Sequence, residues 1–210
     1  KNFPDVALVP IVSSAKALRI ICKRWMDRYA RIPDAVVVEG PLSGGHQGFS
    51  YEDCFKEEYQ LENVLPQVVD EAQKWGSIPV IAAGGIWDRN DINRMMALGA
   101  SGVQMGTRWL GSQECDAIAY RDLMPSVKKE DIELVKSPVG YPARAVKTGI
   151  FEAMAQGDAP KIRCISNCVS PCHRGVEAKK VGYCIADSLG RGYMGDRNYG
   201  LYFTGANGYR

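Results

Sequence analysis

Four short apolar runs constrain the fold of this chain most strongly, because a segment with helical spacing follows each of the first three. The runs are residues 6–12, 35–38, 78–83 and 102–105. They are apolar throughout rather than alternating, as in strands that are buried on both faces of a parallel sheet. The sequence therefore predicts an α/β fold, with a parallel sheet covered by helices on its faces.

The intervening segments carry start and stop signals typical of helices. Ser13 and Ser14 can cap a helix over residues 15–29, and a second helix is predicted over residues 62–75. Residues 88–99 predict a third, with Asp88 as a cap candidate and Gly99 as its stop. From about Pro125 the alternation ends. The remainder predicts a helical appendage with an irregular tail that returns to the sheet.

Composition excludes several classes of function. The chain has 210 residues, 46% of them hydrophobic and 24% charged, with a formal net charge of +2. Interspersed charges give no basic face for nucleic acid and no reason to expect a membrane surface as partner. Because no apolar stretch approaches the length of a membrane span and no signal peptide opens the chain, we expect a cytoplasmic protein.

The cysteines leave two interpretations open. Seven cysteines cannot all pair within one chain, and four of them crowd toward the C-terminus: Cys164, Cys168, Cys172 and Cys184. Together with His173 they could bind zinc or an iron–sulfur cluster, but the spacing is not that of paired CxxC motifs. Buried free thiols are the favoured interpretation, and no metal site is predicted.

Two glycine turns follow the third and fourth runs. Gly84 and Gly85 come directly after the third, and Gly106 and Thr107 directly after the fourth. Glycines at strand ends let backbone N–H groups converge, and the following helix adds its positive N-terminal end. In (β/α)8 barrels, the loops after the last two strands frequently bind phosphate. The pair of turns therefore predicts a phosphate site.

A third glycine-rich loop, "EGPLSGGHQGF" over residues 39–49, follows the second run and contains His46, one of only two histidines. An imidazole titrates near neutral pH and can accept or donate a proton there. Gly44 and Gly45 would let this loop approach a planar ligand. His46 is thus the candidate catalytic residue, and the alternative is a histidine that only hydrogen-bonds within its own loop.

These motifs, together with "IPVIAAGGI", "ALGASGVQMGTRW" and "GYPARAVKTG", resemble the nitronate monooxygenases, formerly called 2-nitropropane dioxygenases. They also resemble the related flavin-dependent enoyl-acyl-carrier-protein reductases. The resemblance covers roughly residues 6–148. It implies a (β/α)8 TIM barrel that binds FMN, with His46 acting on the substrate. The implied cofactor-binding residues are Glu39, Gly44, Gly84, Gly85, Gly106 and Thr107.

The resemblance also implies what the chain lacks. The four runs match strands five to eight of the family's barrel, and the chain begins at Lys1 rather than at a methionine. An eight-stranded barrel usually takes about 250 residues. We therefore expect residues 1–124 to form the C-terminal half of an FMN-binding barrel, and residues 125–210 to form the appendage with its cysteine-rich segment and tail.

Three functions remain as hypotheses. The first is FMN-dependent oxidation of alkyl nitronates by dioxygen to a carbonyl compound and nitrite. The second is NAD(P)H-dependent reduction of an enoyl thioester. The third is a non-catalytic flavin- or phosphate-binding subunit. The expected partners are a small-molecule substrate and dioxygen, with a homo-oligomer as a further expectation.

Overall fold

The structure is a computed structural model that describes residues 5–158, 161–165, 167–168, 172 and 175–210. By its internal contacts the chain divides into two compact units. Unit 1 comprises Lys1–Leu42 and Glu52–Met105, and unit 2 comprises Ser43–Tyr51 and Gly106–Arg210. Each unit has its own sheet and its own core, and each is described here by itself.

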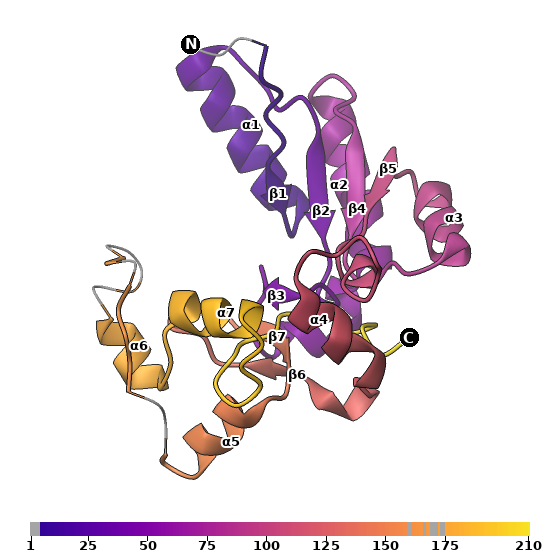
Figure 1. Cartoon of the computed structure of the whole chain (residues 1–210). Helices are drawn as coiled ribbons and strands as arrows, with labels where there is room; N and C mark the ends of the chain where they lie inside the picture. Colours follow the sequence, from indigo (N-terminus) through magenta and orange to yellow (C-terminus); the bar gives the residue numbers. More distant parts are fainter. Residues whose placement is uncertain (1–4, 159–160, 166, 169–171, 173–174) are drawn as a thin grey trace. The chain divides into compact units, whose positions relative to one another are not determined.

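Unit 1 contains a four-stranded parallel sheet in the order β1-β2-β4-β5 (Figure 1). Its strands are β1 (Ile11–Val12), β2 (Val36–Glu39), β4 (Val80–Ala83) and β5 (Gly102–Gln104). Each lies within or at the end of one of the four apolar runs, so the predicted parallel sheet is confirmed. The register pairs Glu39 with Ala83 and Ala83 with Gln104. The carboxyl ends of β2, β4 and β5 are therefore level at one edge of the sheet.

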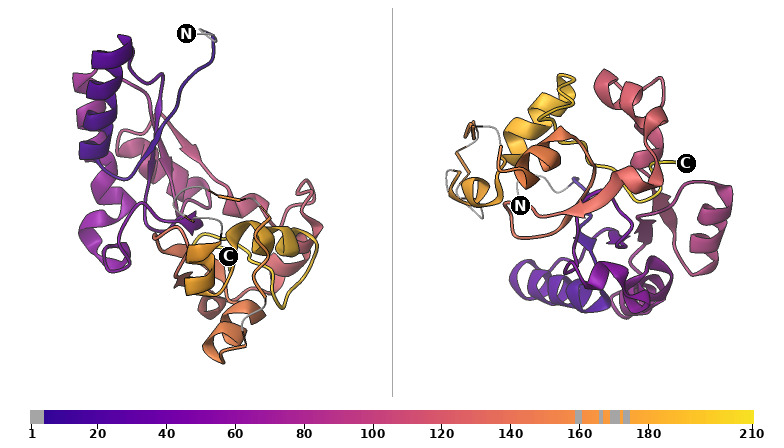
Figure 2. Two further views of the ribbon diagram at one scale, coloured as in Figure 1. Left: turned by 90° about the vertical axis from the view of Figure 1, so that its left-hand side faces the viewer. Right: turned by 90° about the horizontal axis from the view of Figure 1, so that it is seen from below.

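The helices of unit 1 begin within one residue of where the sequence predicts. They are α1 (Ala15–Tyr29), α2 (Leu61–Lys74) and α3 (Arg89–Ala97), with two 3-10 turns at Asp53–Phe55 and Glu57–Tyr59. The Ser14 hydroxyl accepts a hydrogen bond from the Ala17 N–H at 3.2 Å, which caps α1. Figure 2 shows α1, in indigo, running alongside the strands of its sheet.

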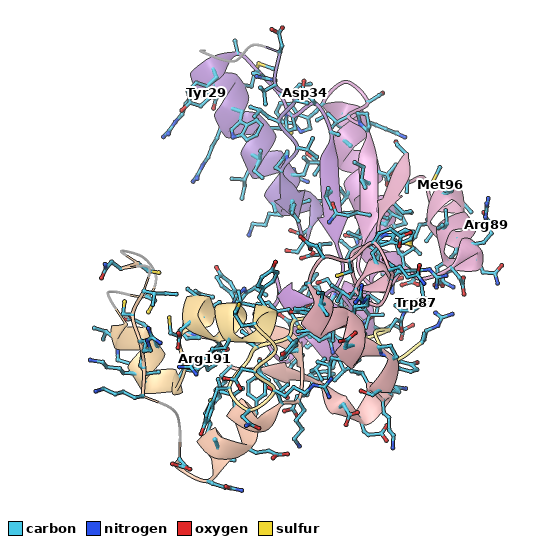
Figure 3. The ribbon with its side chains drawn as sticks, viewed as in Figure 1. Tyr29, Asp34, Trp87, Arg89, Met96 and Arg191 are labelled. Carbon is cyan, nitrogen blue, oxygen red and sulfur yellow. The ribbon has the colours of Figure 1, made fainter. Side chains whose placement is uncertain are left out.

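The core of unit 1 lies between the sheet and its helices. β2 contributes Val36 and Val38, and α2 contributes Leu65 and Val68, all of them fully buried. Each such side chain contributes about 1.5–3 kcal/mol by leaving water. Helix α3 has one face buried against the core and one face exposed to solvent. Its Met95 is 1% exposed, whereas Met96 is 44% exposed on the outer side of the helix (Figure 3).

Unit 2 contains a second sheet, which is antiparallel and has the order β3-β7-β6. Its strands are β3 (Gly45–His46), β6 (Ile132–Val135) and β7 (Ala143–Val146). Sequence analysis identified none of these, because β3 has two residues in a glycine-rich loop and the other two are short. A signal for the β6–β7 hairpin exists in Pro138 and Gly140, which are turn residues between two apolar segments.

The helices of unit 2 are short. They are α4 (Ile118–Leu123), α5 (Gly149–Ala155), α6 (Val176–Val181) and α7 (Ile185–Tyr193), with 3-10 turns at Thr107–Trp109, Met124–Ser126 and Lys129–Asp131. The C-terminal tail contacts the antiparallel sheet of unit 2. Phe203 forms an isolated antiparallel bridge with Ala145 of β7, and the Val146 N–H donates to the Tyr202 carbonyl at 2.8 Å.

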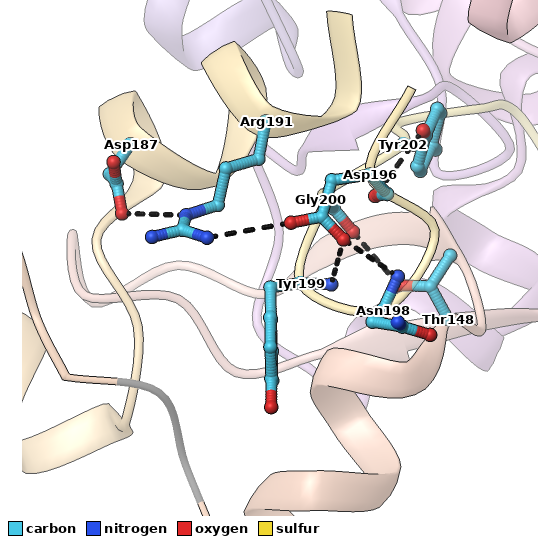
Figure 4. Close-up of polar contacts among 8 residues, drawn as sticks. All are labelled: Thr148, Asp187, Arg191, Asp196, Asn198, Tyr199, Gly200 and Tyr202. Atoms are coloured by element: carbon cyan, nitrogen blue, oxygen red, sulfur yellow. Dashed lines mark hydrogen bonds and ion pairs between the residues drawn. The ribbon is translucent and has the colours of Figure 1, made fainter. Parts of the chain in front are cut away.

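A loop built around Asp196 leads into this tail (Figure 4). The Asp196 carboxylate accepts hydrogen bonds from the Asn198 and Tyr199 N–H groups at 2.9 and 3.0 Å, and it pairs with Arg191 of α7 at 3.4 Å. The Thr148 hydroxyl donates to the Gly200 carbonyl at 2.9 Å. The loop thereby fixes the point at which the tail enters β-structure.

None of the helices in the described ranges has the length and apolar character that crossing a bilayer requires.

Candidate functional site

His46 lies on the short edge strand of the unit 2 sheet, and the sheet register determines its neighbours. His46 pairs with Ala143 of β7, and Ala143 also pairs with Val135 of β6. Directly opposed residues of antiparallel strands point to the same face. Ala145, two residues further along β7, shares that face and bridges to Phe203 of the tail. The alanines leave room on this face for the larger rings of His46 and Phe203.

The His46 imidazole has two partners, both distant in sequence. Its Nε2 lies 2.7 Å from the Ser137 hydroxyl oxygen, and its ring meets the Phe203 ring edge-to-face with centroids 5.3 Å apart. Partial burial holds the pKa of His46 below its usual 6.5, because burial disfavours the charged ring. The alternative that His46 hydrogen-bonds only within its own loop is therefore wrong.

Hydrogen bonds from Gln47 fix the shape of the loop around His46. The buried Gln47 amide donates to the Ser43 carbonyl at 3.0 Å and to the Gly45 carbonyl at 2.9 Å. The backbone N–H of Gln47 donates to the Pro142 carbonyl at 2.8 Å. This bond extends the pairing of β3 with β7 by one residue beyond each strand. These contacts place the imidazole on a hydrogen-bonded turn.

Gly44 is required for a close backbone approach. A Cβ atom at this position would lie 2.7 Å from the Thr204 carbonyl carbon and 2.8 Å from the Gly205 nitrogen. Within unit 2 the histidine loop thus contacts the backbone of the C-terminal tail. Of the predicted residues, Gly44 and His46 belong to this arrangement.

The Thr107 hydroxyl is hydrogen-bonded to the same C-terminal tail. It accepts a hydrogen bond from the Gly205 N–H at 2.8 Å. Two residues earlier, the Phe203 N–H donates to the Tyr120 hydroxyl at 2.8 Å. The backbone of Gly106 is exposed, and a Cβ atom there would meet nothing within 4 Å. This glycine turn therefore combines a hydroxyl bound to the tail with an open backbone at which an anion has room.

Unit 1 contains the other three predicted ligands: Glu39, Gly84 and Gly85. Glu39 ends β2 and pairs with Ala83, which directly precedes the two glycines. Gly84 and Gly85 have φ values of +98° and +78°, which only glycine adopts readily. Glycine turns at strand ends bring the backbone close to a ligand, because no side chain stands in the way. The chemistry of this turn fits a phosphate group such as that of FMN.

The expected contribution of the next helix is wrong for α3. The Asp88 carboxylate accepts hydrogen bonds from the Asn90 and Asp91 N–H groups, and the Asp91 carboxylate accepts from Trp87 and Asp88. Two carboxylates of the protein itself thus occupy the N-terminus of α3. After Gly106 there is only a three-residue 3-10 turn, Thr107–Trp109. The N-terminus of α3 therefore offers a phosphate fewer N–H groups than the sequence predicts.

Sequence analysis missed two residues that contact His46, namely Ser137 and Phe203. Ser137 is buried in the β6–β7 turn, where its carbonyl accepts from the Gly140 N–H at 3.0 Å. No local sequence pattern identifies either residue as a neighbour of His46, because their proximity to His46 results from strand pairing. The roles of the predicted ligands and of His46 remain predictions.

The exposure of the C-terminal cysteines tests the two interpretations of this group, buried free thiols or a metal site. Cys164 and Cys168 are exposed, and Cys172 and Cys184 are half-buried, so burial does not account for this group. Among the described residues, no group of three or more His, Cys, Asp or Glu side chains is placed to bind a metal ion. His173 lies outside the described residues.

Comparison with solved structures identifies the fold. The chain is similar to FabK from Thermotoga maritima, with a TM-score of 0.68, 27% identity, and coverage of 97% of this chain and 55% of FabK. A nitroalkane oxidase from Streptomyces ansochromogenes has the same fold, with a TM-score of 0.63 at 22% identity, and coverage of 97% and 52%. The predicted fold class, an α/β fold of the (β/α)8 barrel type, is confirmed.

Comparison of sequences identifies the family. A probable nitronate monooxygenase of Staphylococcus aureus (strain Newman) is 40% identical over 135 residues, which cover 60% of this chain and 36% of that protein. A protein of the same description from strain USA300 matches equally. The chain thus spans about a third of the length of these relatives and about half that of the solved structures. The family model for nitronate monooxygenase matches residues 1–210, and the chain accordingly belongs to the nitronate monooxygenase family.

Proposed function

We propose that this chain is part of an FMN-dependent oxidoreductase that oxidises alkyl nitronates with dioxygen to a carbonyl compound and nitrite. The observation that carries the proposal is the position of His46. It lies on a turn fixed by Gln47, with its ring between Ser137 and Phe203. A half-buried imidazole with a lowered pKa is neutral near pH 7 and therefore ready to accept a proton.

FMN would supply the redox chemistry, accepting electrons from the substrate before dioxygen takes them up. The residues of the chain would bind FMN and orient the substrate. The family resemblance assigns the phosphate of FMN to backbone N–H groups of Gly84, Gly85 and Gly106 and to the Thr107 side chain. We assign Glu39 and Gly44 to the ribityl chain or the ring. His46 would take a proton from the nitroalkane or assist oxidation of the nitronate.

Two measurements test this function. The first is the absorbance spectrum of the purified protein, in which two flavin bands should disappear on denaturation as free FMN is released. The second is nitrite production under air, measured with an alkyl nitronate and with the corresponding neutral nitroalkane, which alone has a proton for a base to remove. We expect His46→Ala to keep the flavin bands and to lower the rate with the neutral nitroalkane by about 100-fold, as removal of a general base does. Ser126→Ala is a control, since that hydroxyl donates to the Leu123 carbonyl within its own turn, at 2.8 Å.

The resemblance to flavin-dependent enoyl-acyl-carrier-protein reductases supports a second candidate, NAD(P)H-dependent reduction of an enoyl thioester. Consumption of NAD(P)H with an enoyl thioester, without nitrite from a nitronate, would favour it. Flavin bands without either turnover would indicate a non-catalytic flavin-binding protein. Absence of flavin bands and of any FMN binding would contradict both flavin-dependent reactions and would leave only the phosphate-binding form of the third function.

A further inference from the structure

The strand that carries His46 does not by itself fix the plane of the imidazole. β3 is an edge strand, and the residue opposite His46 is Ala143, whose side chain is a single methyl group. The torsion between the Cβ atom and the ring of a histidine has broad minima. The contact between His46 Nε2 and the Ser137 hydroxyl, at 2.7 Å, holds one edge of the ring. A second contact, elsewhere on the ring, is needed to fix its plane.

Phe203 supplies this second contact from the C-terminal tail. Ala145 pairs with Glu133 of β6 on one side of β7, so its bridge to Phe203 lies on the other side, where β3 pairs. Phe203 thus continues the edge of β3, on the face that carries His46. The two rings meet at 71° with their centroids 5.3 Å apart, which is a favoured arrangement for aromatic rings.

Backbone hydrogen bonds hold the tail around Phe203. The Phe203 N–H donates to the Tyr120 hydroxyl at 2.8 Å. Two residues later, the Gly205 N–H donates to the Thr107 hydroxyl, also at 2.8 Å. Between them, the N–H of the fully buried Thr204 donates to a carbonyl of β7 at 3.3 Å. The main chain that carries the Phe203 ring is thus hydrogen-bonded to three separate elements of unit 2.

We propose that Phe203, held in place by the hydrogen bonds of the tail, is a positioning residue that fixes the plane of the His46 ring and keeps Nε2 at the Ser137 hydroxyl. The use of this plane in a proton transfer rests on the proposed function, whereas the contact between the rings does not. A base must point its lone pair at the proton that it removes, and a misplacement of about 1 Å can lower a rate about 100-fold. A phenyl ring has no proton to transfer, so Phe203 acts only through His46.

The first test observes the two rings directly, by nuclear Overhauser contacts in the protein without substrate. His173→Gln leaves His46 as the single histidine, since the chain has two. We expect contacts from the His46 ring protons to the Phe203 ring and to the Ser137 β protons. In Phe203→Leu the contact with Ser137, which this substitution does not itself remove, should weaken. An unchanged contact with Ser137 in that variant would overturn the proposal, whatever the activity of the protein.

Two further variants separate positioning from packing. Phe151→Leu is the matched control, because Phe151 packs against the same hydrophobic cluster as Phe203, whereas its ring meets that of Tyr183, with centroids 6.2 Å apart. It should lower stability and leave the contact between His46 and Ser137 unchanged. Phe203→Tyr keeps an aromatic ring and should keep that contact. An equal loss of the contact in both leucine variants would assign the effect to general packing and contradict the proposal.

Tyr120→Phe tests the attachment of the tail. It removes the hydroxyl that accepts the Phe203 N–H and keeps the ring, which meets that of Tyr202 edge-to-face with centroids 5.0 Å apart. Hydrogen exchange of the Phe203 amide should become faster, and the contact of Phe203 with His46 should weaken. Tyr193→Phe is the control, since Tyr193 is 58% exposed. Unchanged exchange in Tyr120→Phe would contradict the role of the tail.

Kinetics separate this inference from the proposed function. With a neutral nitroalkane under air, Phe203→Leu should lower kcat about 10- to 100-fold with little change in KM, because it misplaces the base without removing a group that binds substrate. Phe203→Tyr should recover most of the rate, and Phe151→Leu should keep it. If the wild-type protein produces no nitrite but the contact of His46 with Ser137 depends on Phe203, the proposed function fails while the positioning contact stands. If nitrite is produced and kcat is unchanged in Phe203→Leu, the positioning role fails.

Discussion

At the scale of single residues, the surroundings of His46 determine when it can act as a base. Burial lowers the pKa of His46 below 6.5. A folded-state pKa below the unfolded value means that the unfolded chain binds the proton more readily. Protonation of this group therefore destabilises the fold as the pH falls below about 6.5, and above that pH the group has no effect on stability.

We accordingly expect the NMR titration of His46 in the His173→Gln variant to have its midpoint below pH 6.5, because a partly buried ring resists charging. The acid limb of kcat/KM for nitrite production should have the same midpoint. A midpoint at or above 6.5 would show that an interaction with the charged ring outweighs its burial. An acid-unfolded sample provides the reference value.

Gly44 is a second position at which one atom matters. Gly44→Ala places a Cβ against the backbone of Thr204 and Gly205, which cannot move aside as a side-chain end can. We expect a loss of about 1–3 kcal/mol in the free energy of unfolding, the usual cost of overpacking, measured in urea.

The control for Gly44→Ala is Gly190→Ala in α7. A Cβ at Gly190 meets nothing within 4 Å, and alanine is favoured over glycine in a helix by up to about 1 kcal/mol. The two variants should therefore change stability in opposite directions. Equal effects would mean that the close approach of loop and tail does not exist in solution.

At the scale of elements, a buried carboxylate joins α1 to α2. Glu71 of α2 is 3% exposed and accepts two hydrogen bonds from Arg19 of α1, at 3.0 and 3.1 Å. Trp75 and Lys74 donate to it as well. The hydrogen bond from Arg19 is the main reason that the pKa of Glu71 falls to about 2. A folded-state pKa below the unfolded 4.5 stabilises the protein above pH 4.5, and this stabilisation is lost as the pH falls toward 2.

Glu71→Gln should therefore lower the free energy of unfolding by about 1–3 kcal/mol at pH 7, as loss of hydrogen bonds to a charged group does. The difference from the wild type should shrink between pH 4.5 and 2. Glu62→Gln on the same helix is the control, because its pair with Arg94 is 42% and 52% exposed. Exposed pairs contribute less than about 1 kcal/mol. A difference that persists at pH 2 would assign the effect to packing rather than to charge.

At the scale of the whole molecule, cofactor binding would be linked to stability. A ligand that binds only the folded chain stabilises it, by about 2.7 kcal/mol at 100 times its Kd. We expect FMN to raise the unfolding temperature, and riboflavin, which lacks the phosphate, to raise it much less. Equal shifts would show that the glycine turns do not bind phosphate. An equal concentration of inorganic phosphate controls for ionic strength.

The sequence by itself determined the local structure. Apolar runs, the Ser14 and Asp88 caps and the Gly99 stop act over a few residues, so the parallel strands and three long helices follow from them. The glycine turns and the histidine loop were recognisable because their backbone conformations restrict the residue type. Membership of the family was visible for the same reason.

Tertiary structure alone decided which residues surround His46. Ser137 lies 91 positions away in sequence, and Phe203 is still more distant. Strand pairing across Ala143 and Ala145 brings them together, and no local pattern encodes it. The occupied N-terminus of α3 was equally hidden, because Asp91 resembles an ordinary helical acid until its carboxylate is seen to accept the Trp87 and Asp88 N–H groups. Short-range preferences act along the chain, whereas the environment of a site depends on segments that meet only after folding.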